Sequence, residues 1–284
     1  MKNVEHFVRW DQRVRPKKWS AKIGGIKRCE HKLDGFRVTV VRDGRKNVWA
    51  VGRKSHGEDL WPKMMECLER RDITAIANMP DGTVLDGELY IPGDYASEVA
   101  VRMANGGVGV RFQPFAVPFA AKVDLRDVSF ERRDAILGHL DFLPPEHESD
   151  WPESEGELSA LASALDIEGF MLKQGHYRGW YKVKRWQSAD CIVVGTEPGQ
   201  GKHEGRLGAL KIAVFKGLNM VDCGKVGIGG DSLWRDMDED EVLGKVVEVK
   251  HEGLQNRGAL RFPRFLRWRD DKPAWECTYD QLLD

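Results

Sequence analysis

Glu30-His31-Lys32-Leu33-Asp34-Gly35-Phe36-Arg37 is the stretch of this sequence that is most informative about fold and chemistry. It places a lysine beside a tight Asp-Gly turn, with a carboxylate just before it and an arginine just after it. Asp-Gly turns are common in hairpins, and a lysine beside one is usually only solvated. The same arrangement also presents Lys32 as a nucleophile to a nucleotide phosphate. Four segments further along the chain favour this second interpretation.

Lysine is a poor nucleophile while it is protonated. We therefore expect neighbouring cations or a metal ion to lower the pKa of Lys32.

The charge of the chain is unevenly distributed. Its 284 residues, 41% of them hydrophobic, suffice for one or two domains with sizeable cores. The formal net charge is −1, but residues 135–171 contain no Lys or Arg, and residues 257–269 contain five arginines and no acid. A polyanion would be repelled by the first region and attracted by the second. For each region alone, a mixed solvated surface is the alternative.

The cysteines and the N-terminus indicate an intracellular protein. The five cysteines are widely spread and form no Cys-x-x-Cys pair, which argues against a zinc site or a disulfide framework. Residues 1–15 lack the apolar stretch of a signal peptide, and no segment approaches the roughly 20 apolar residues of a membrane span. We expect a soluble, cytoplasmic protein.

The apolar pattern predicts an α+β fold. Helices are expected over residues 58–71, 130–140 and 155–165, and strands over 36–41, 46–51, 83–91, 168–173 and 180–184. The first two strands read as a hairpin joined through Asp43-Gly44. After Gln187, short strands over 191–195, 209–215, 220–226 and 246–251 alternate with glycine-rich turns. This change of texture predicts a domain boundary near Ser188 and a small β-barrel after it.

Two carboxylates begin or end apolar strands. Glu88 follows Asp86-Gly87, and Glu168 precedes Gly169 and an apolar run. Carboxylates are the usual protein ligands of a magnesium ion that also holds substrate phosphates. The alternative is that each residue only marks a strand end.

Two further segments carry paired cations. Period-two alternation puts Lys182 and Lys184 on one strand face, where they converge on one anion or protect a sheet edge from aggregation. Near the C-terminus, Arg269 and Lys272 flank Asp270 and Asp271. An ordinary surface ion-pair cluster is the alternative there.

Together, the five segments resemble the covalent nucleotidyltransferases, which include DNA ligases, RNA ligases and mRNA capping enzymes. The series is Lys-x-Asp-Gly, Asp-Gly-Glu, Glu-Gly-x-x-x-Lys, Lys-x-Lys and Arg-x-Asp-Lys, in the family's order from Lys32 to Lys272. Residues 205–210 and 260–265 make the chain most similar to ATP-dependent DNA ligases. The resemblance implies an adenylation domain with mixed or antiparallel sheets over residues 1–187, and an OB-fold domain over 188–284.

The resemblance also implies roles for residues near the lysine. Lys32 would become linked to AMP, Glu30 would read the adenine amino group, and Arg37 would lie near the ribose and the nick phosphate. Glu88 and Glu168 would hold the ribose and a divalent metal such as Mg²⁺.

For the later motifs, Lys182 and Lys184 would contact the α-phosphate. Arg269 and Lys272 would orient the departing pyrophosphate.

The sequence departs from the family pattern at two places. The family's Ser-Arg pair is Gly52-Arg53 here, and Arg53 is assigned to the nucleotide. The Phe-Asp of the adenine-stacking strand is Phe115-Ala116. Phe115 is the assigned stacking ring, with Phe112 as the rival and simple core packing as the alternative.

The implied reaction seals nicks in duplex DNA in three steps. Lys32 attacks the α-phosphorus of ATP, AMP passes to a 5′-phosphate at the nick, and the 3′-hydroxyl displaces AMP. Only 31 residues precede Lys32, so a nicotinamide-binding or large DNA-binding domain is not expected. This predicts a monomeric, minimal ligase of the phage or bacterial kind, active in replication, recombination or repair. The alternatives are an RNA ligase, a GTP-dependent capping enzyme, and a non-catalytic OB-type nucleic-acid binder.

Overall fold

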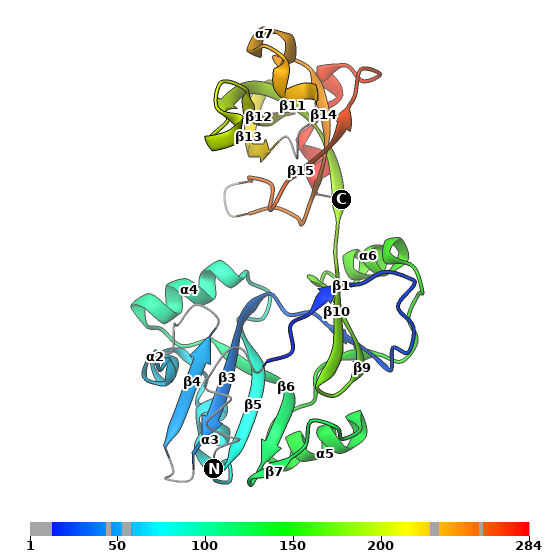
Figure 1. Ribbon diagram of the computed structural model, residues 1–284. Coiled ribbons are helices and arrows are strands. Elements are labelled where there is room, and N and C mark those ends of the chain that lie inside the picture. The colour runs from blue at the N-terminus through cyan, green and yellow to red at the C-terminus, as the bar shows by residue number, and fades with distance from the viewer. Residues whose placement is uncertain (1–12, 44–46, 53–57, 228–232, 256–257, 284) are drawn as a thin grey trace. The chain divides into compact units, whose positions relative to one another are not determined.

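The computed structural model describes residues 13–43, 47–52, 58–227, 233–255 and 258–283. The chain divides into two compact units, Met1–Lys184 (unit 1) and Arg185–Asp284 (unit 2). Unit 1 contains two sheets with helices, and unit 2 is built around a barrel (Figure 1).

The first sheet of unit 1 is built around the strand that follows Lys32. Its strands run in the order β4-β3-β5-β6-β7, and every neighbouring pair is antiparallel. They are β3 (Gly35–Arg42), β4 (Val48–Gly52), β5 (Thr83–Tyr90), β6 (Arg111–Ala120) and β7 (Val123–Asp124). The predicted hairpin is confirmed as the β3–β4 pair, although residues 44–46 of its turn lie outside the described ranges.

The second sheet of unit 1 contains the strand that precedes Lys32. Its order is β1-β10-β9-β2-β8, with β1 parallel to β10 and the other pairs antiparallel. The strands are β1 (Lys17–Lys18), β2 (Arg28–His31), β8 (His147–Glu148), β9 (Gly169–Gly175) and β10 (Arg178–Lys184). Because β2 and β3 belong to different sheets, Lys32 lies in the short link that joins the two sheets.

Five helices accompany these sheets within the described part of unit 1. They are α2 (Trp61–Cys67), α3 (Arg70–Asn78), α4 (Ala96–Asn105), α5 (Phe130–His139) and α6 (Glu155–Ala164). The predictions of α5 and α6 are confirmed. Each begins after a serine, Ser129 or Ser154, whose hydroxyl accepts a backbone N–H of the first turn.

The prediction of one helix over residues 58–71 is wrong. The chain forms α2 and then α3, because Leu68 between them is extended (φ −69°, ψ 148°) and bridges to Val110. Leu68 is buried in the core between the first sheet and its helices. Its tertiary contact therefore overrides a spacing of apolar residues that fits a helix.

Alternation along β9 gives its two faces different neighbours. Phe170 and Leu172 pack with Leu158 of α6 in one apolar cluster. Met171 points to the other face and packs in a second cluster with Trp180 and Phe115, which come from β10 and β6. This second cluster therefore joins the two sheets.

Unit 2 is a closed barrel with the strand order β11-β12-β13-β15-β14. The strands are β11 (Gln187–Pro198), β12 (Leu207–Lys216), β13 (Asn219–Gly227), β14 (Val246–His251) and β15 (Arg264–Trp268), and one helix is α7 (Glu239–Val242). Gly217, at φ +61°, begins the two-residue turn between β12 and β13, a position that favours glycine. The predicted β-barrel is confirmed.

The fold is α+β, as predicted. All five cysteines are buried and unbridged. In the described ranges, helices are too short or too polar to span a bilayer.

Candidate active site

Lys32 is placed by the strands on either side of it. Its backbone N–H donates to the carbonyl of Gly169 at 2.9 Å, which brings the lysine to the start of β9. Three residues later, Gly35 enters β3 so close to β5 that a Cβ there would lie 2.0 Å from the carbonyl oxygen of Leu89. The Asp-Gly signature therefore reflects a close approach of two backbones.

The amine of Lys32 forms an ion pair with Glu168. Glu168 also holds Lys184, whose Nζ lies 3.5 Å from Oε1. The carboxylate side chain is 9% exposed and the two lysines are 20% and 22% exposed. We call these three residues the Glu168 cluster.

The surroundings of Lys32 raise its pKa. Burial acts to lower it, but the negative charges of Glu168, Glu88 and Asp34 outweigh burial. The expectation that neighbouring protein cations lower this pKa is therefore wrong. The protein groups alone keep the amine protonated.

Glu88 is half-buried on β5, opposite Arg37 of β3. Burial raises its pKa to about 8, helped by the negative charge of Glu168 and opposed by Lys32 and Arg37. Two acids and a lysine thus share one site. Proximity of like charges and desolvation are the usual reasons why a carboxyl holds its proton near neutral pH.

Arg37 is held away from solvent by a bidentate ion pair. Its Nε and Nη2 donate to the two oxygens of Asp86 at 2.9 and 2.6 Å, and Nη1 donates to the carbonyl of Val14 at 2.6 Å. Its guanidinium also lies 5.5 Å from the ring centre of Phe115 and 5.2 Å from that of Trp180. Asp86 is part of the Asp-Gly-Glu motif. This motif therefore supplies two groups, the carboxylate of Glu88 and the ion-pair partner of Arg37.

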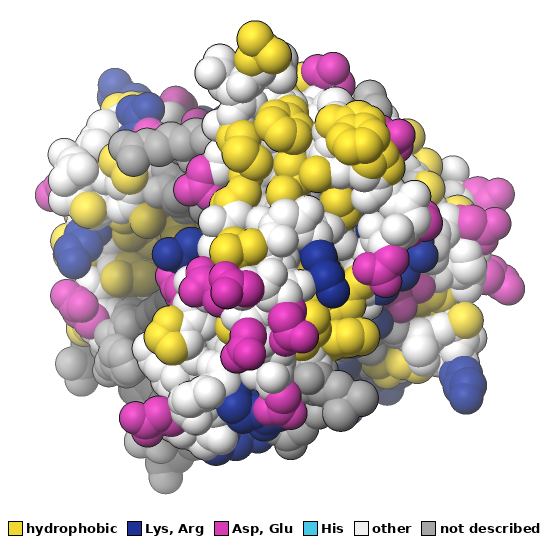
Figure 2. Space-filling view, turned by 90° about the horizontal axis from the view of Figure 1, so that it is seen from above, with side chains coloured by type: hydrophobic (Ala, Val, Ile, Leu, Met, Phe, Trp, Pro, Cys, Tyr) yellow, Lys and Arg dark blue, Asp and Glu magenta, His cyan; other side chains and the backbone are white. Residues whose placement is uncertain are grey.

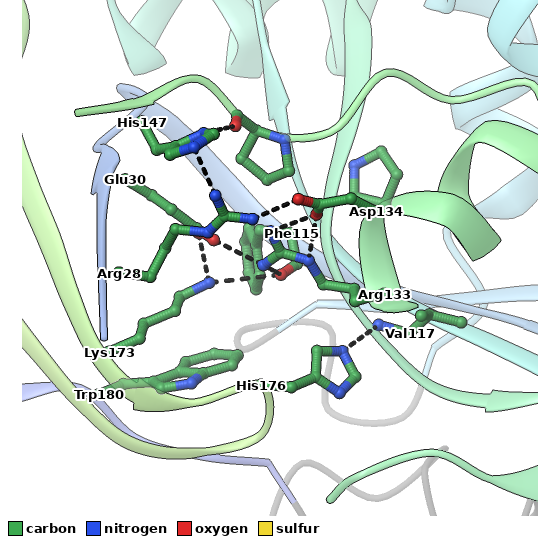
Figure 3. A network of polar contacts seen from close by, with 12 residues as sticks. Arg28, Glu30, Phe115, Val117, Arg133, Asp134, His147, Lys173, His176 and Trp180 are labelled. Atoms are coloured by element: carbon green, nitrogen blue, oxygen red, sulfur yellow. Dashed lines mark hydrogen bonds and ion pairs between the residues drawn. The ribbon is translucent and has the colours of Figure 1, made fainter. Parts of the chain in front are cut away.

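Glu30 lies in a buried polar network (Figure 3). Its oxygens accept from Arg133 and from Lys173, each at 2.5 Å, and all three side chains are at most 2% exposed. The two cations also donate to the carbonyl of Phe115, at 3.1 and 3.3 Å. We call these contacts the Glu30 network. Burial acts to raise the pKa of Glu30, but the positive charges of Lys173 and Arg133 outweigh it and lower this pKa.

The two candidate stacking rings occupy different environments. Phe112 is 2% exposed and packs edge-to-face on Phe142 in the core. Phe115 is half-buried, beside Trp180 and the ammonium of Lys173. This difference favours Phe115 over Phe112 as a ring that meets a ligand.

Of the remaining predicted residues of unit 1, the structure describes Lys182 and Lys184 but not Arg53. Lys182 and Lys184 lie on the same face of β10, as the alternation requires, and both are half-buried. Arg53 lies outside the described residues.

In unit 2, Arg269 and Lys272 share one carboxylate. Arg269 donates to both oxygens of Asp190 at 3.0 and 2.9 Å, and Lys272 donates to Oδ2 at 2.8 Å. A hydrogen bond from Arg269 lowers the pKa of Asp271 to about 2. We call Asp190, Arg269 and Lys272 the Asp190 cluster.

Sequence reasoning missed two partners in these sites. Arg133 pairs with a residue 103 positions away and Asp190 with one 79 positions away, and neither belongs to a motif. Only the long-range pairing of strands and helices brings them in. A weak signal was present for Asp190, an acid that directly precedes the apolar run over residues 191–194 of β11.

The described residues contain no group of three or more His, Cys, Asp or Glu side chains arranged to hold a metal ion. Glu88 and Glu168 both act on the charge of Lys32. Two carboxylates fit Mg²⁺, which usually takes one or two protein carboxylates and completes its shell with substrate phosphates and water.

Comparison with known proteins relates the chain to DNA ligases. Residues 198–269 match the family of DNA ligase OB-like domains. A DNA ligase of Haloarcula marismortui is 29% identical over a stretch that covers 86% of this chain and 51% of that protein. A probable DNA ligase of Nocardioides sp. is 31% identical over a stretch that covers 90% of this chain and 57% of that protein. The chain thus spans little more than half the length of these relatives.

Two solved structures share the fold. The match to one of them, named Pmar-Lig_PreS3, covers 87% of this chain and 64% of that protein, with a TM-score of 0.65 and 22% identity. A Lig E DNA ligase covers 90% of this chain and 100% of its own length, with a TM-score of 0.59 and 22% identity. The predicted resemblance to DNA ligases and the predicted class of fold, an α+β domain followed by an OB barrel, are confirmed.

Proposed function

We propose that this chain is an ATP-dependent DNA ligase that seals nicks in duplex DNA through a lysine–AMP intermediate. The observation that carries the proposal is the Glu168 cluster, in which Lys32 meets an acid and a second lysine at the link between two sheets. Residues 1–187 would form the adenylation domain and residues 188–284 the OB domain. The similarity to DNA ligases extends over most of the chain and supports this reading.

In the first step, Nζ of Lys32 forms a bond to the α-phosphorus of ATP, and the bond from that phosphorus to the bridging oxygen of the pyrophosphate breaks. AMP is then transferred to the 5′-phosphate at the nick. The 3′-hydroxyl finally attacks that phosphate and releases AMP. Lys32 must lose its proton before the first step, because an ammonium has no lone pair.

Lys182 and Lys184 would place their positive charges beside the α-phosphate during this reaction. Glu88 and Glu168 would hold Mg²⁺ together with the phosphates. When bound, the ion would neutralise the two carboxylates that raise the pKa of Lys32. It would also offset the charge of the leaving pyrophosphate.

The base would be selected by Glu30 and Phe115. A carboxylate accepts a hydrogen bond from the exocyclic amine of adenine and repels the O6 acceptor of guanine. Phe115 offers a half-buried ring for stacking. Arg37 and Arg53 would lie near the ribose and phosphates.

In unit 2, Arg269 and Lys272 would orient the pyrophosphate in the first step. Arginines and lysines on both domains would bind the DNA backbone in a salt-dependent way, without reading its sequence. We place the enzyme in the cytoplasm and expect it to act as a monomer.

The proposal is tested by incubating the chain with Mg²⁺ and labelled ATP, GTP or NAD, and then with nicked DNA or nicked RNA. We expect a covalent label from ATP and a sealed DNA strand. A label from GTP alone would indicate a capping enzyme, and joining of RNA but not DNA would indicate an RNA ligase. Binding of DNA without any covalent label would contradict the proposal.

A further inference from the structure

Arg133 is the largest fully buried side chain of the described residues, and its exposed fraction is 0%. A buried guanidinium is costly unless its N–H groups are matched by acceptors. Here Nη1 donates to Glu30 and to the carbonyl of Phe115, while Nε and Nη2 both donate to Asp134, at 2.8 and 2.6 Å (Figure 3). The guanidinium is thus fixed from two sides.

Phe115 needs such a donor because it lies in a bulge. Pairing between β5 and β6 steps from Asp86 opposite Ala116 to Gly87 opposite Pro114, so Phe115 has no partner in the register. A bulge leaves its extra residue outside the ladder and redirects its side chain. The carbonyl of Phe115 is satisfied instead by Arg133 and Lys173.

Glu30 depends on the same two cations. Arg133 binds Oε1 and Lys173 binds Oε2, and together they keep the carboxylate ionised although it is 2% exposed. Each carboxylate oxygen has two acceptor positions, so each retains capacity for one more donor. Removing Arg133 would leave a buried carboxylate with one cation in place of two.

We propose that Arg133 is a positioning residue for base selection. It keeps the Glu30 carboxylate ionised and fixes its orientation. Through its hydrogen bond to the carbonyl of Phe115, it also stabilises the bulge that orients the ring. One side chain of α5 thereby couples β2 of one sheet to β6 of the other. The inference rests on the proposed function, because Glu30 and Phe115 matter in this way only if the chain binds ATP.

Arginine is required for geometric reasons. The three acceptors Glu30, Phe115 O and Asp134 lie around one planar guanidinium, whose fixed fork can serve them together. A lysine would keep the buried charge but cannot reach both sides with the same directions.

The test measures covalent labelling with ATP and with inosine triphosphate, which replaces the exocyclic amine with a carbonyl oxygen. In Arg133→Met we expect KM for ATP to rise roughly 10- to 100-fold, as for a lost hydrogen bond to a charged group. The maximal rate of labelling should stay nearly unchanged, and the preference for ATP over inosine triphosphate should be lost. Arg132→Met is the matched control, since Arg132 is the exposed neighbour on the same helix and should behave like the unsubstituted chain.

A double-mutant cycle separates positioning from simple stabilisation. If Arg133 acts through Glu30, Arg133→Met should reduce the ATP preference little further when Glu30→Gln is already present. Arg133→Lys should restore part of the preference. Thermal unfolding identifies the variants that fold. If Arg133→Met does not fold, Arg133→Lys takes its place. Its KM for ATP should be higher, and its preference for ATP lower, than those of the unsubstituted chain.

Two results would overturn the inference. One is a folded Arg133→Met, or Arg133→Lys in its place, with unchanged KM and unchanged ATP preference. The other is a variant that loses maximal rate and stability while its ratio of ATP to inosine triphosphate labelling stays the same. Absence of any label on the unsubstituted chain would instead overturn the proposed function, and this inference with it.

Discussion

The Glu168 cluster of unit 1 and the Asp190 cluster of unit 2 have the same composition, a carboxylate that holds two cations, and they are similarly exposed. In unit 1 the members are Glu168, Lys32 and Lys184, and in unit 2 they are Asp190, Arg269 and Lys272. The four cationic side chains are between 19% and 22% exposed. Geometry alone therefore does not distinguish a reactive lysine from a structural one.

The difference lies in the charges around each cluster. Lys32 is surrounded by further acids that hold its proton. Under the proposed function, a bound metal ion would neutralise these acids. Hydrogen bonds from Arg269 to Asp271, together with the charge of Asp190, raise the pKa of an arginine that is protonated in any case. The Glu168 cluster would release a proton only when such an ion binds, whereas the Asp190 cluster offers permanent positive charge.

The largest expected effect is on the lysine itself. Lys32→Arg keeps a cation beside Glu168 but cannot supply a neutral amine, so covalent labelling by ATP should disappear while the melting temperature changes little. Lys63→Arg is the control, because Lys63 forms an exposed ion pair with Glu58 at 3.8 Å. Residual labelling of Lys32→Arg would remove the distinction between the two clusters.

The second-largest effect is expected from the central carboxylates of the two clusters, Glu168 and Asp190, whose substitution should slow labelling to different extents. Glu168→Gln should slow labelling roughly 100- to 1000-fold, the usual cost of removing one group that stabilises a transition state. Asp190→Asn should cost much less, since it loosens two cations that keep their charge. Single-turnover rates of both variants provide the comparison, and equal losses would contradict it.

A smaller and step-specific effect is expected from the Asp190 cluster. Arg269→Ala or Lys272→Ala should slow self-adenylation about 10- to 100-fold, as expected for one charge-assisted hydrogen bond. Sealing of a nick that already carries the 5′-adenylate should be unaffected, because no pyrophosphate is released there. Equal loss on ordinary and pre-adenylated nicks would assign these residues to DNA binding or folding instead.

The smallest effect concerns stability and pH. Because the pKa of Glu88 is raised to about 8 in the folded chain, its contribution to stability is present below the ordinary value of 4.5 and is lost as pH rises through about 8. Without nucleotide or metal, Glu88→Gln should therefore be more stable than the parent at pH 9, by on the order of 1 kcal/mol, and not at pH 4. Denaturant unfolding at the two pH values measures this, and an equal difference at both would argue against the raised pKa.

Much of the fold follows from local signals. The predicted strands over 83–91 and 246–251 correspond to β5 and β14, because the preference of β-branched residues for strands and of glycines for turns acts over a few residues. The break at Leu68 did not follow, since it depends on a bridge to Val110 across the fold. Local periodicity carries no record of such a contact.

The site divides in the same way. Lys32 and Glu168 stand in short motifs and come together through the hydrogen bond from Lys32 to Gly169. Arg133 could not be predicted, because its partners come from strands of both sheets. The pKa of Lys32 also could not be predicted in sign, since it depends on which acids the register brings close.

The central claim is that Lys32 carries the covalent nucleotide, and peptide mapping by mass spectrometry tests it most directly. The chain is incubated with ATP and Mg²⁺, digested, and searched for an adenylyl group on every lysine-containing peptide. The account predicts one adenylated residue, Lys32, and none in Lys32→Arg. An adenylyl group on Lys184, Lys272 or any other residue, with Lys32 unmodified, would contradict it.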